Sequence, residues 1–210
     1  MTYFQRLLGG ALLSLAAFSV QAVELAISAE DAYAKTQQTA EPVLLVDVRD
    51  PVEIMFVGFT DAVDTNIPFL MADRTQWNAE RNIFPMERNP EFVEQVKAEL
   101  ARRGWDEQTE VITMCRSGSE RGEPSAVVLR EAGLPNARFV VNGFQGAALS
   151  EGPQAGMRLK NGWQNSGLPW SSKLNGDKIY RTDRYARLHC VYACSMLITL
   201  FGVIYVELHT

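Results

Sequence analysis

Runs of apolar residues divide the chain into alternating strands and helices. The continuous apolar run at 43–48 is typical of a parallel strand that is buried on both faces, and the strand-like run at 109–114 predicts a second strand. Shorter runs at 62–67 and 137–141 predict two more strands, and Pro68 ends the first of them.

Apolar residues at helical spacing predict helices between these strands. Ser28 and Asp31 form a capping arrangement at the start of the first helix, and Gly133 follows the last one as a C-cap. The expected helices cover 28–37, 51–57, 90–104 and 122–132.

The alternation of strands and helices predicts right-handed β–α–β units around a parallel sheet, which is an α/β fold. In such sheets, ligands bind outside the carboxyl ends of the strands. Asp47 and Cys115 both lie at predicted carboxyl ends. We therefore expect a functional site at that edge of the sheet.

Two segments depart from the alternation. Residues 70–89 have mixed polarity and contain Pro85, which predicts an inserted lid or loop. Residues 150–178 are rich in Gly, Pro, Ser and Asn, and we expect Trp163 and Trp170 to anchor them on the domain. Contact of these tryptophans with a ligand is the alternative.

Composition narrows the range of functions. A hydrophobic content of 47% is enough for a sizeable core, and a net charge of −5 with mixed signs predicts no nucleic-acid partner. Cys115, Cys190 and Cys194 are too few for a disulfide framework. Both histidines lie near the C-terminus, so we expect neither a Cys–His catalytic pair nor a zinc site, and no cofactor.

Residues 1–22 are typical of a secretory signal peptide. Arg6 is followed by an apolar stretch, and Val20 and Ala22 occupy the positions that a signal peptidase reads. Cleavage after Ala22 would place the protein in the periplasm, an oxidising compartment. A buried N-terminal helix and an uncleaved membrane anchor are the alternatives.

The C-terminal part has a different composition. After a predicted linker at 171–187, residues 188–206 carry no formal charge and are long enough for a helix that spans a bilayer, which predicts membrane association. Arg181, Arg184 and Arg187 precede this segment, and in an exported protein they would lie outside, against the positive-inside tendency. A helix at the membrane interface and a packed C-terminal helix are therefore alternatives.

The strongest chemical signal lies between the strand at 109–114 and the helix at 122–132. Cys115 stands where backbone N–H groups and the helix dipole favour a thiolate. Gly118 and Gly122 let the backbone curl with its amides inward, and Arg121 adds a planar cation that suits oxyanions. A buried cysteine followed by a polar turn is the alternative. We predict Cys115 as the nucleophile and an anion-binding loop of Arg116, Ser117, Gly118, Ser119, Glu120 and Arg121.

A charged cluster follows the strand at 43–48 and consists of Asp47, Arg49, Asp50 and Glu53. It fits either a solvated turn with a helix cap or an ion pair, such as Arg49 with Glu53, that holds the turn. We assign Asp47 and Arg49 to structural support near the site and give them no catalytic role.

Together, these motifs resemble the single-domain rhodanese-like family. The residues that carry the resemblance are 45–50 with Glu53, then 66–68, 115–118, 162–163 and 167–169. The resemblance covers residues 28–170 and implies a five-stranded parallel sheet flanked by helices. It also implies that Cys115 carries a persulfide sulfur from an anionic donor such as thiosulfate to a thiophilic acceptor.

The length of the loop leaves three functions open. From Cys115 to Arg121 it is one residue longer than in ordinary sulfurtransferases of the family. Residues 119–122 are similar to the loop of related dual-specificity phosphatases and arsenate reductases. The protein is thus a sulfurtransferase, a phosphatase or arsenate reductase that uses Cys115 and Arg121, or a non-enzymatic sulfur carrier or binding module. The Arg-Ser-Gly after Cys115 and the expected export favour the first.

Overall fold

A parallel sheet forms the centre of the protein in a computed structural model, which describes residues 24–182. The predicted signal peptide and the apolar segment 188–206 lie outside the described residues. Five strands pair in the order β1-β7-β6-β2-β3, and every pairing is parallel. This confirms the predicted α/β class and the five-stranded sheet. The strands are β1 (Ala26–Ile27), β2 (Val43–Asp47), β3 (Thr65–Asn66), β6 (Glu110–Met114) and β7 (Arg138–Val140).

The two central strands are apolar on both faces because each face carries its own core. Leu45 of β2 and Ile112 of β6 pair in register and belong to one core, whereas the neighbouring Leu44 and Val111 belong to the other. Alternate side chains of a strand point to opposite faces, so a continuous apolar run is needed to fill both cores. Cys115 lies in the second core.

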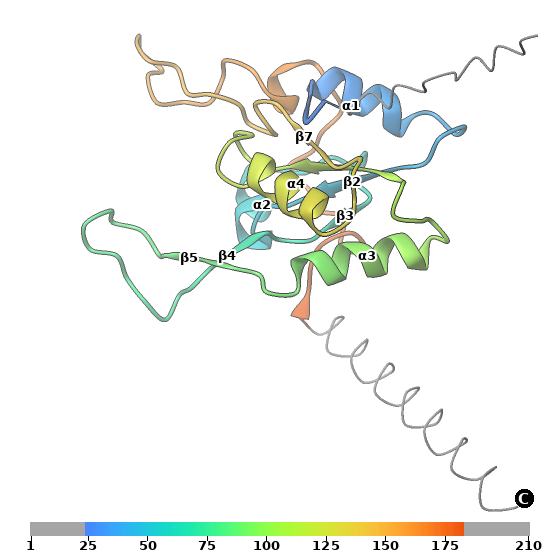
Figure 1. The fold of residues 1–210 in the computed structure, drawn as a ribbon. Coiled ribbons are helices and arrows are strands. Elements are labelled where there is room, and N and C mark those ends of the chain that lie inside the picture. Colours follow the sequence, from blue (N-terminus) through green and yellow to red (C-terminus); the bar gives the residue numbers. More distant parts are fainter. Residues whose placement is uncertain (1–23, 183–210) are drawn as a thin grey trace, which may run out of the picture.

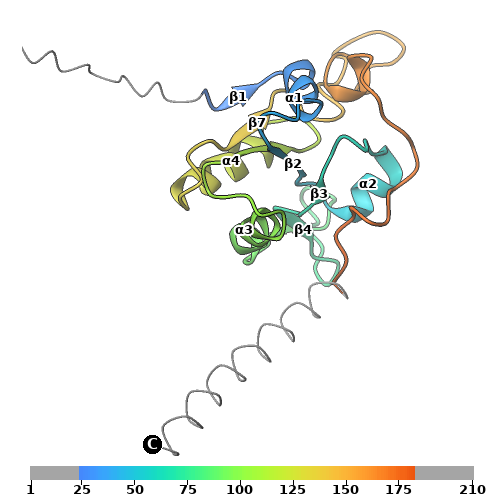
Figure 2. The same cartoon turned by 90° about the vertical axis from the view of Figure 1, so that its right-hand side faces the viewer.

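Helices cover both faces of the sheet. They are α1 (Ala29–Thr36), α2 (Pro51–Val57), α3 (Phe92–Arg102), α4 (Gly122–Glu131) and the 3-10 helix η1 (Trp163–Asn165). Figure 2 shows α1 and α2 on one side of the sheet and α3 and α4 on the other. The four predicted helices are confirmed, and Ser28 caps α1 as expected, because its side chain accepts a hydrogen bond from the amide of Asp31.

Residues 70–89 are more regular than predicted. Strands β4 (Leu70–Ala72) and β5 (Met86–Arg88) pair antiparallel, and an isolated bridge joins Asn78 to Ile83 nearer the tip. The expectation of an irregular loop was therefore wrong at both ends of the segment. Its backbone groups find partners within the segment itself, which mixed side-chain polarity does not reveal. Figure 1 shows this hairpin projecting away from the body of the domain.

The compact unit extends beyond residue 170. Ser171 and Phe59 exchange backbone hydrogen bonds of 2.8 Å in both directions, and Ile179 is part of a core. The first part of the predicted linker thus packs on the domain. Trp163 is buried and Trp170 lies edge-on against Phe144, as expected for structural anchors. Across residues 24–182, no helix combines the length and the apolarity needed to cross a membrane.

Candidate functional site

Cys115 lies directly after β6, at the carboxyl edge of the sheet, and its side chain is buried. The amide of Gly118 donates a hydrogen bond to the Cys115 sulfur at 3.1 Å. Gly122 begins α4, and a Cβ atom at that position would stand 3.4 Å from the same sulfur. A sulfur at the start of a helix, with an amide directed at it, is in a position that favours negative charge.

The rest of the predicted loop contributes unequally to the surroundings of the sulfur. Gly118 is buried with φ +90°, and a Cβ atom there would come within 2.8 Å of the amide nitrogen of Asn142. Arg116 and Ser117 are half-buried, whereas Ser119 and Glu120 are exposed. Glu120 therefore faces solvent, and it is poorly placed to act as a general acid that protonates a leaving group.

A second segment, residues 142–146, donates backbone hydrogen bonds to the loop, and we call this segment the brace. The amide of Phe144 donates to the carbonyl oxygen of Cys115 at 2.7 Å, and the amides of Gln145 and Gly146 donate to that of Arg116 at 2.9 and 3.1 Å. Gly143 has φ +56°, and a Cβ atom there would lie 2.2 Å from the Cys115 carbonyl oxygen. The two closely spaced glycines after the strand at 137–141 were the available sequence signal for this brace.

Arg121 closes the loop, and its charge is matched by Glu53 from α2. The two terminal nitrogens of Arg121 donate to the two carboxylate oxygens of Glu53 at 2.7 and 3.1 Å. The pair is largely buried, with side-chain exposures of 5% and 19%. Burial alone would lower the pKa of Arg121, but hydrogen bonds to Glu53 and the negative charges of Glu53, Cys115 and Asp47 outweigh it and raise that pKa.

Asp47 and Arg49 form a second, fully buried ion pair beneath the site. A terminal nitrogen of Arg49 donates to the Asp47 carboxylate at 2.6 Å and to the Gly58 carbonyl at 3.1 Å. The guanidinium also lies 4.1 Å from the ring centre of Phe144, a member of the brace. The suggested pair of Arg49 with Glu53 was therefore wrong. Arg49 precedes Asp50, the N-cap of α2, so helical i,i+4 spacing does not apply to it.

Asn66 completes this support, a role that the sequence pattern did not predict. Its side-chain nitrogen donates to the carbonyl oxygens of Asp47 and Arg49 at 2.8 and 2.9 Å. It therefore fixes the turn between β2 and α2, on which Glu53 depends. The position of Asn66 directly before Ile67-Pro68 was the only available signal.

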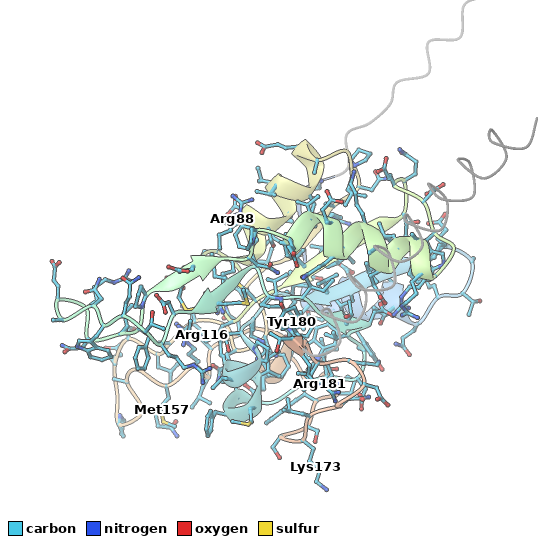
Figure 3. The ribbon with its side chains drawn as sticks, turned by 90° about the horizontal axis from the view of Figure 1, so that it is seen from below. Arg88, Arg116, Met157, Lys173, Tyr180 and Arg181 are labelled. Carbon is cyan, nitrogen blue, oxygen red and sulfur yellow. The ribbon has the colours of Figure 1, made fainter. Side chains whose placement is uncertain are left out.

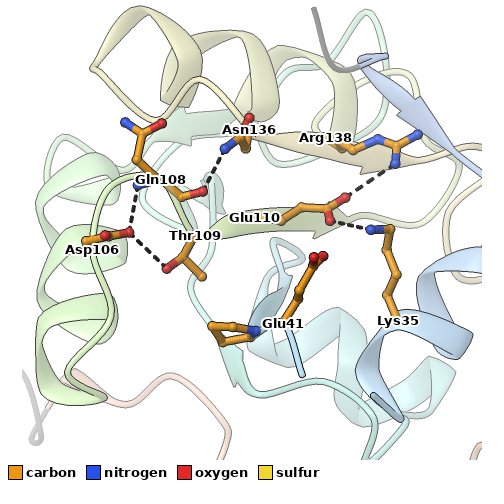
Figure 4. A pocket seen from close by; sticks show the side chains of 9 residues that line it. Lys35, Glu41, Asp106, Gln108, Thr109, Glu110, Asn136 and Arg138 are labelled. Atoms are coloured by element: carbon orange, nitrogen blue, oxygen red, sulfur yellow. Dashed lines mark hydrogen bonds and ion pairs between the residues drawn. The ribbon is translucent and has the colours of Figure 1, made fainter. Parts of the chain in front are cut away.

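A large cavity occupies the opposite edge of the sheet. It has a volume of about 560 Å³ and lies at the amino ends of β6 and β7 (Figure 4). In this cavity, the Glu110 carboxylate forms ion pairs with Lys35 at 2.6 Å and with Arg138 at 3.3 Å, so the three charged side chains are paired with one another. It contains none of the predicted site residues. Among residues 24–182, no three His, Cys, Asp or Glu side chains gather in a way that could hold a metal ion.

Comparison with known proteins identifies a family. The family model described as Rhodanese-like domain matches residues 28–149. A crystal structure of a rhodanese-related protein from Thermoplasma volcanium is 19% identical, with a TM-score of 0.40, and the match covers 71% of this chain and 100% of that one. A solution structure of an Arabidopsis thaliana protein is 23% identical, with a TM-score of 0.30, and the match covers 58% of this chain and 85% of that one. No curated protein matches the chain.

Proposed function

Because this chain belongs to the rhodanese-like domain family, we propose that it is a sulfurtransferase with Cys115 as its nucleophile. It moves a sulfane sulfur from thiosulfate, or a similar small anionic donor, to a thiophilic acceptor. The observation that carries the proposal is the charge balance of the loop. An amide is directed at the sulfur, while the arginine that closes the loop is already paired.

This charge balance suits a persulfide better than a phosphoryl group. A persulfide carries a single negative charge, which one or two backbone amides and a helix N-terminus can stabilise. A phosphoryl group held on Cys115 is a tetrahedral dianion, and it calls for bidentate contact with a free guanidinium. In this structure Glu53 accepts hydrogen bonds from both terminal nitrogens of Arg121, so a phosphoryl group bound by Arg121 would have to break a largely buried ion pair.

The proposed reaction has two transfer steps. The Cys115 thiolate attacks the outer sulfur of thiosulfate, a new S–S bond forms, and sulfite leaves with the electron pair of the old S–S bond. The acceptor thiolate then attacks the terminal sulfur of the persulfide, takes it away and regenerates the Cys115 thiolate. Neither step needs a cofactor or a proton at the reacting sulfur.

Arg116 is the residue that we propose for attracting the donor. It is half-buried, and its Nε atom has no hydrogen-bond partner among the described residues. Figure 3 shows Arg116 on the side of the molecule from which the hairpin projects. A permanent positive charge beside the nucleophile raises the local concentration of small anions.

The proposal includes a location in the periplasm, with cleavage after Ala22. It is supported by the apolar stretch at 7–20 and by the residues that precede the cleavage position. Membrane association through 188–206 is part of the same proposal.

One set of assays tests the function. The full chain is assayed in parallel for thiosulfate-dependent sulfur transfer to cyanide or a thiol and for aryl-phosphate hydrolysis. We expect sulfur transfer only, and we expect Cys115→Ser to abolish it. Mass spectrometry after thiosulfate treatment is expected to show one added sulfur atom on Cys115.

Three outcomes would replace the proposal. Hydrolysis of aryl phosphate or reduction of arsenate, without sulfur transfer, would assign the site to oxyanion chemistry. Equal sulfur-transfer rates in the Cys115→Ser variant would exclude both enzymatic functions. Formation of the persulfide without turnover would leave a sulfur carrier.

A further inference from the structure

Two neighbouring elements expose an unusual number of large apolar side chains, which we call the apolar face. Val52, Met55 and Phe56 lie on the outer side of α2, and Phe56 is 81% exposed. The hairpin contributes Trp77, Ile83, Phe84 and Met86. Contiguous exposed apolar side chains, unlike scattered ones, mark a contact surface.

The two halves of the apolar face are joined at the root of the hairpin. The amide of Ala72 in β4 donates to the carboxylate of Asp50, the N-cap of α2, at 3.0 Å. A cavity of about 550 Å³ is lined by Val52 of α2 and by Met71 and Phe84 of the hairpin. Trp77 packs edge-on against Phe84, with 5.3 Å between the ring centres, so it continues the surface toward the tip of the hairpin.

The chain leaves the domain at this same place. Tyr180, Arg181 and Thr182, the last described residues, line the cavity together with Val52 and Phe84. Figure 3 shows Tyr180 and Arg181 in the central part of this view. Beyond them, the sequence continues through Arg184 and Arg187 into the uncharged segment 188–206. An apolar segment of that length has a lipid bilayer as its expected surroundings.

We propose that the apolar face rests in the interfacial layer of a lipid bilayer, beside the point where segment 188–206 enters it. Aromatic side chains with exposed rings, such as Trp77 and Phe84, are favoured in that layer. The connection from Tyr180 to Leu188 is short, so a membrane-bound segment 188–206 would hold the face close to the lipid surface. The inference rests on the proposed membrane association of segment 188–206 and does not depend on the sulfur chemistry.

The charges of the hairpin indicate which lipid headgroups the contact requires. Arg74, Arg81 and Arg88 are balanced within the same segment by Asp73, Glu80 and Glu87. A surface without net charge gains little from anionic headgroups. The contact is therefore apolar, and it forms on zwitterionic phosphatidylcholine.

Tryptophan fluorescence in vesicles tests this contact. The full chain is reconstituted into phosphatidylcholine vesicles, and part of the lipid is replaced by phosphatidylcholine with brominated acyl chains, which quench nearby tryptophans. We expect quenching in the natural protein and a loss of about half or more of it in Trp77→Phe. Trp105→Phe is the matched control, because Trp105 is half-buried near Pro42 and Val43 at the opposite edge of the sheet.

Two results would contradict the proposed contact with lipid. Equal quenching in the natural protein and in Trp77→Phe would overturn the proposal, and so would failure of the full chain to bind the vesicles. Circular dichroism of both variants checks that they are folded. A second variant, Phe56→Ser, tests the part of the apolar face that lies on α2. In the natural protein, we expect trypsin to cleave at Arg74 and Arg81 more slowly in vesicles than in solution. We expect this protection from cleavage to be smaller in Phe56→Ser.

Discussion

The charge of Arg121 is matched inside the protein before any substrate arrives. Its ion pair with Glu53 joins the end of the cysteine loop to α2, which is a distant part of the chain. Burial makes the pair costly to break, because either partner alone would be left as a poorly solvated charge. At the scale of single residues, we expect this pair to determine which anions the site accepts.

Replacement of Glu53 by glutamine should therefore change anion selectivity. We expect Glu53→Gln to lower the free energy of unfolding by about 1–3 kcal/mol, because Arg121 loses its charged partner. The freed guanidinium should also make phosphate a several-fold stronger inhibitor of sulfur transfer. Urea unfolding and inhibition constants measure the two effects.

Glu120→Gln is the control for this variant, since Glu120 is an exposed carboxylate of the same loop. It should leave stability and inhibition nearly unchanged. If phosphate inhibited Glu53→Gln no better than the natural protein, the idea that Glu53 masks Arg121 would be wrong.

The loop residues could be predicted from local spacing, but their partners could not. Cys115 and Arg121 stand at a strand–helix junction that is visible in the sequence. The bond from Arg121 to Glu53 spans 68 residues, and no local pattern reports a contact of that range. Local spacing even pointed to the wrong pair, Arg49 with Glu53, because the spacing rule assumes that both residues lie in the helix.

At the scale of elements, the cysteine loop depends on the brace at 142–146. Three backbone hydrogen bonds run from the brace to the carbonyl oxygens of Cys115 and Arg116. The contact is close enough that only glycine fits at position 143, where φ is positive. The brace, and not the loop alone, therefore fixes the positions of the Cys115 and Arg116 carbonyl groups.

Gly143→Ala should damage both folding and catalysis. Its Cβ atom would lie 2.2 Å from a carbonyl oxygen, so we expect a loss of about 3 kcal/mol or more of stability and most of the sulfur-transfer activity. Gly152→Ala also has a positive φ, yet no heavy atom lies within 4 Å of the added carbon. This control should lose only about 1 kcal/mol and keep its activity, as measured by thermal unfolding and turnover. Similar losses in both variants would contradict a steric role for the brace.

Helix α3 carries a stabilising carboxylate whose effect depends on pH. Burial would raise the pKa of Glu99, but hydrogen bonds from Arg102 and Arg103 and their charges outweigh it and lower that pKa below its ordinary value of 4.5. Because the folded-state pKa is depressed, the contribution is fully present above pH 4.5 and is lost as the pH falls through the lowered value.

Glu99→Gln should thus destabilise the protein by about 1 kcal/mol at pH 7 and have progressively less effect below pH 4.5. Urea unfolding as a function of pH measures the difference. The exposed Glu94 of the same helix provides the control, and Glu94→Gln should show a smaller effect at pH 7. A difference between Glu99→Gln and the natural protein that stayed constant down to pH 3 would contradict this account.

Elements with strong periodicity could be predicted, whereas short ones could not. The apolar run at 43–48 and the helical spacing of apolar residues at 90–104 leave little choice of structure. Strand β1 has two residues, too few for any pattern, and it forms because β7 offers it an edge. The hairpin at 70–88 is stabilised by its own backbone pairing, and its polar and apolar side chains give no clear period of two.

At the scale of the whole molecule, residues 171–182 close the fold. Ser171 pairs with Phe59, and the backbone amide of Asn66 in β3 donates to the carbonyl oxygen of Lys178 at 2.7 Å. The fold class followed from the order of strands and helices, but this extension did not, because its few apolar residues show no period. The composition of 150–178 indicated a segment that wraps back and did not show how far it continues.

Replacement of Ile179 tests how much residues 171–182 stabilise the domain. The side chain is buried, so Ile179→Ala should cost about 2–3 kcal/mol of unfolding free energy. Leu174→Ala, in the same segment but exposed, should change it by less than about 0.5 kcal/mol. Chemical denaturation of the full chain distinguishes the two. Equal, small effects would show that the segment is only loosely attached.

The position of β1 at the edge of the sheet has a consequence for the order of folding events. The partner of β1 is β7, and the side chain of Arg138 reaches the carbonyl oxygen of Ala26 across 112 residues. A ribosome releases β1 first, yet this strand must wait for nearly the whole domain before it can pair. This edge of the sheet therefore cannot close until residues 138–140 have been synthesised.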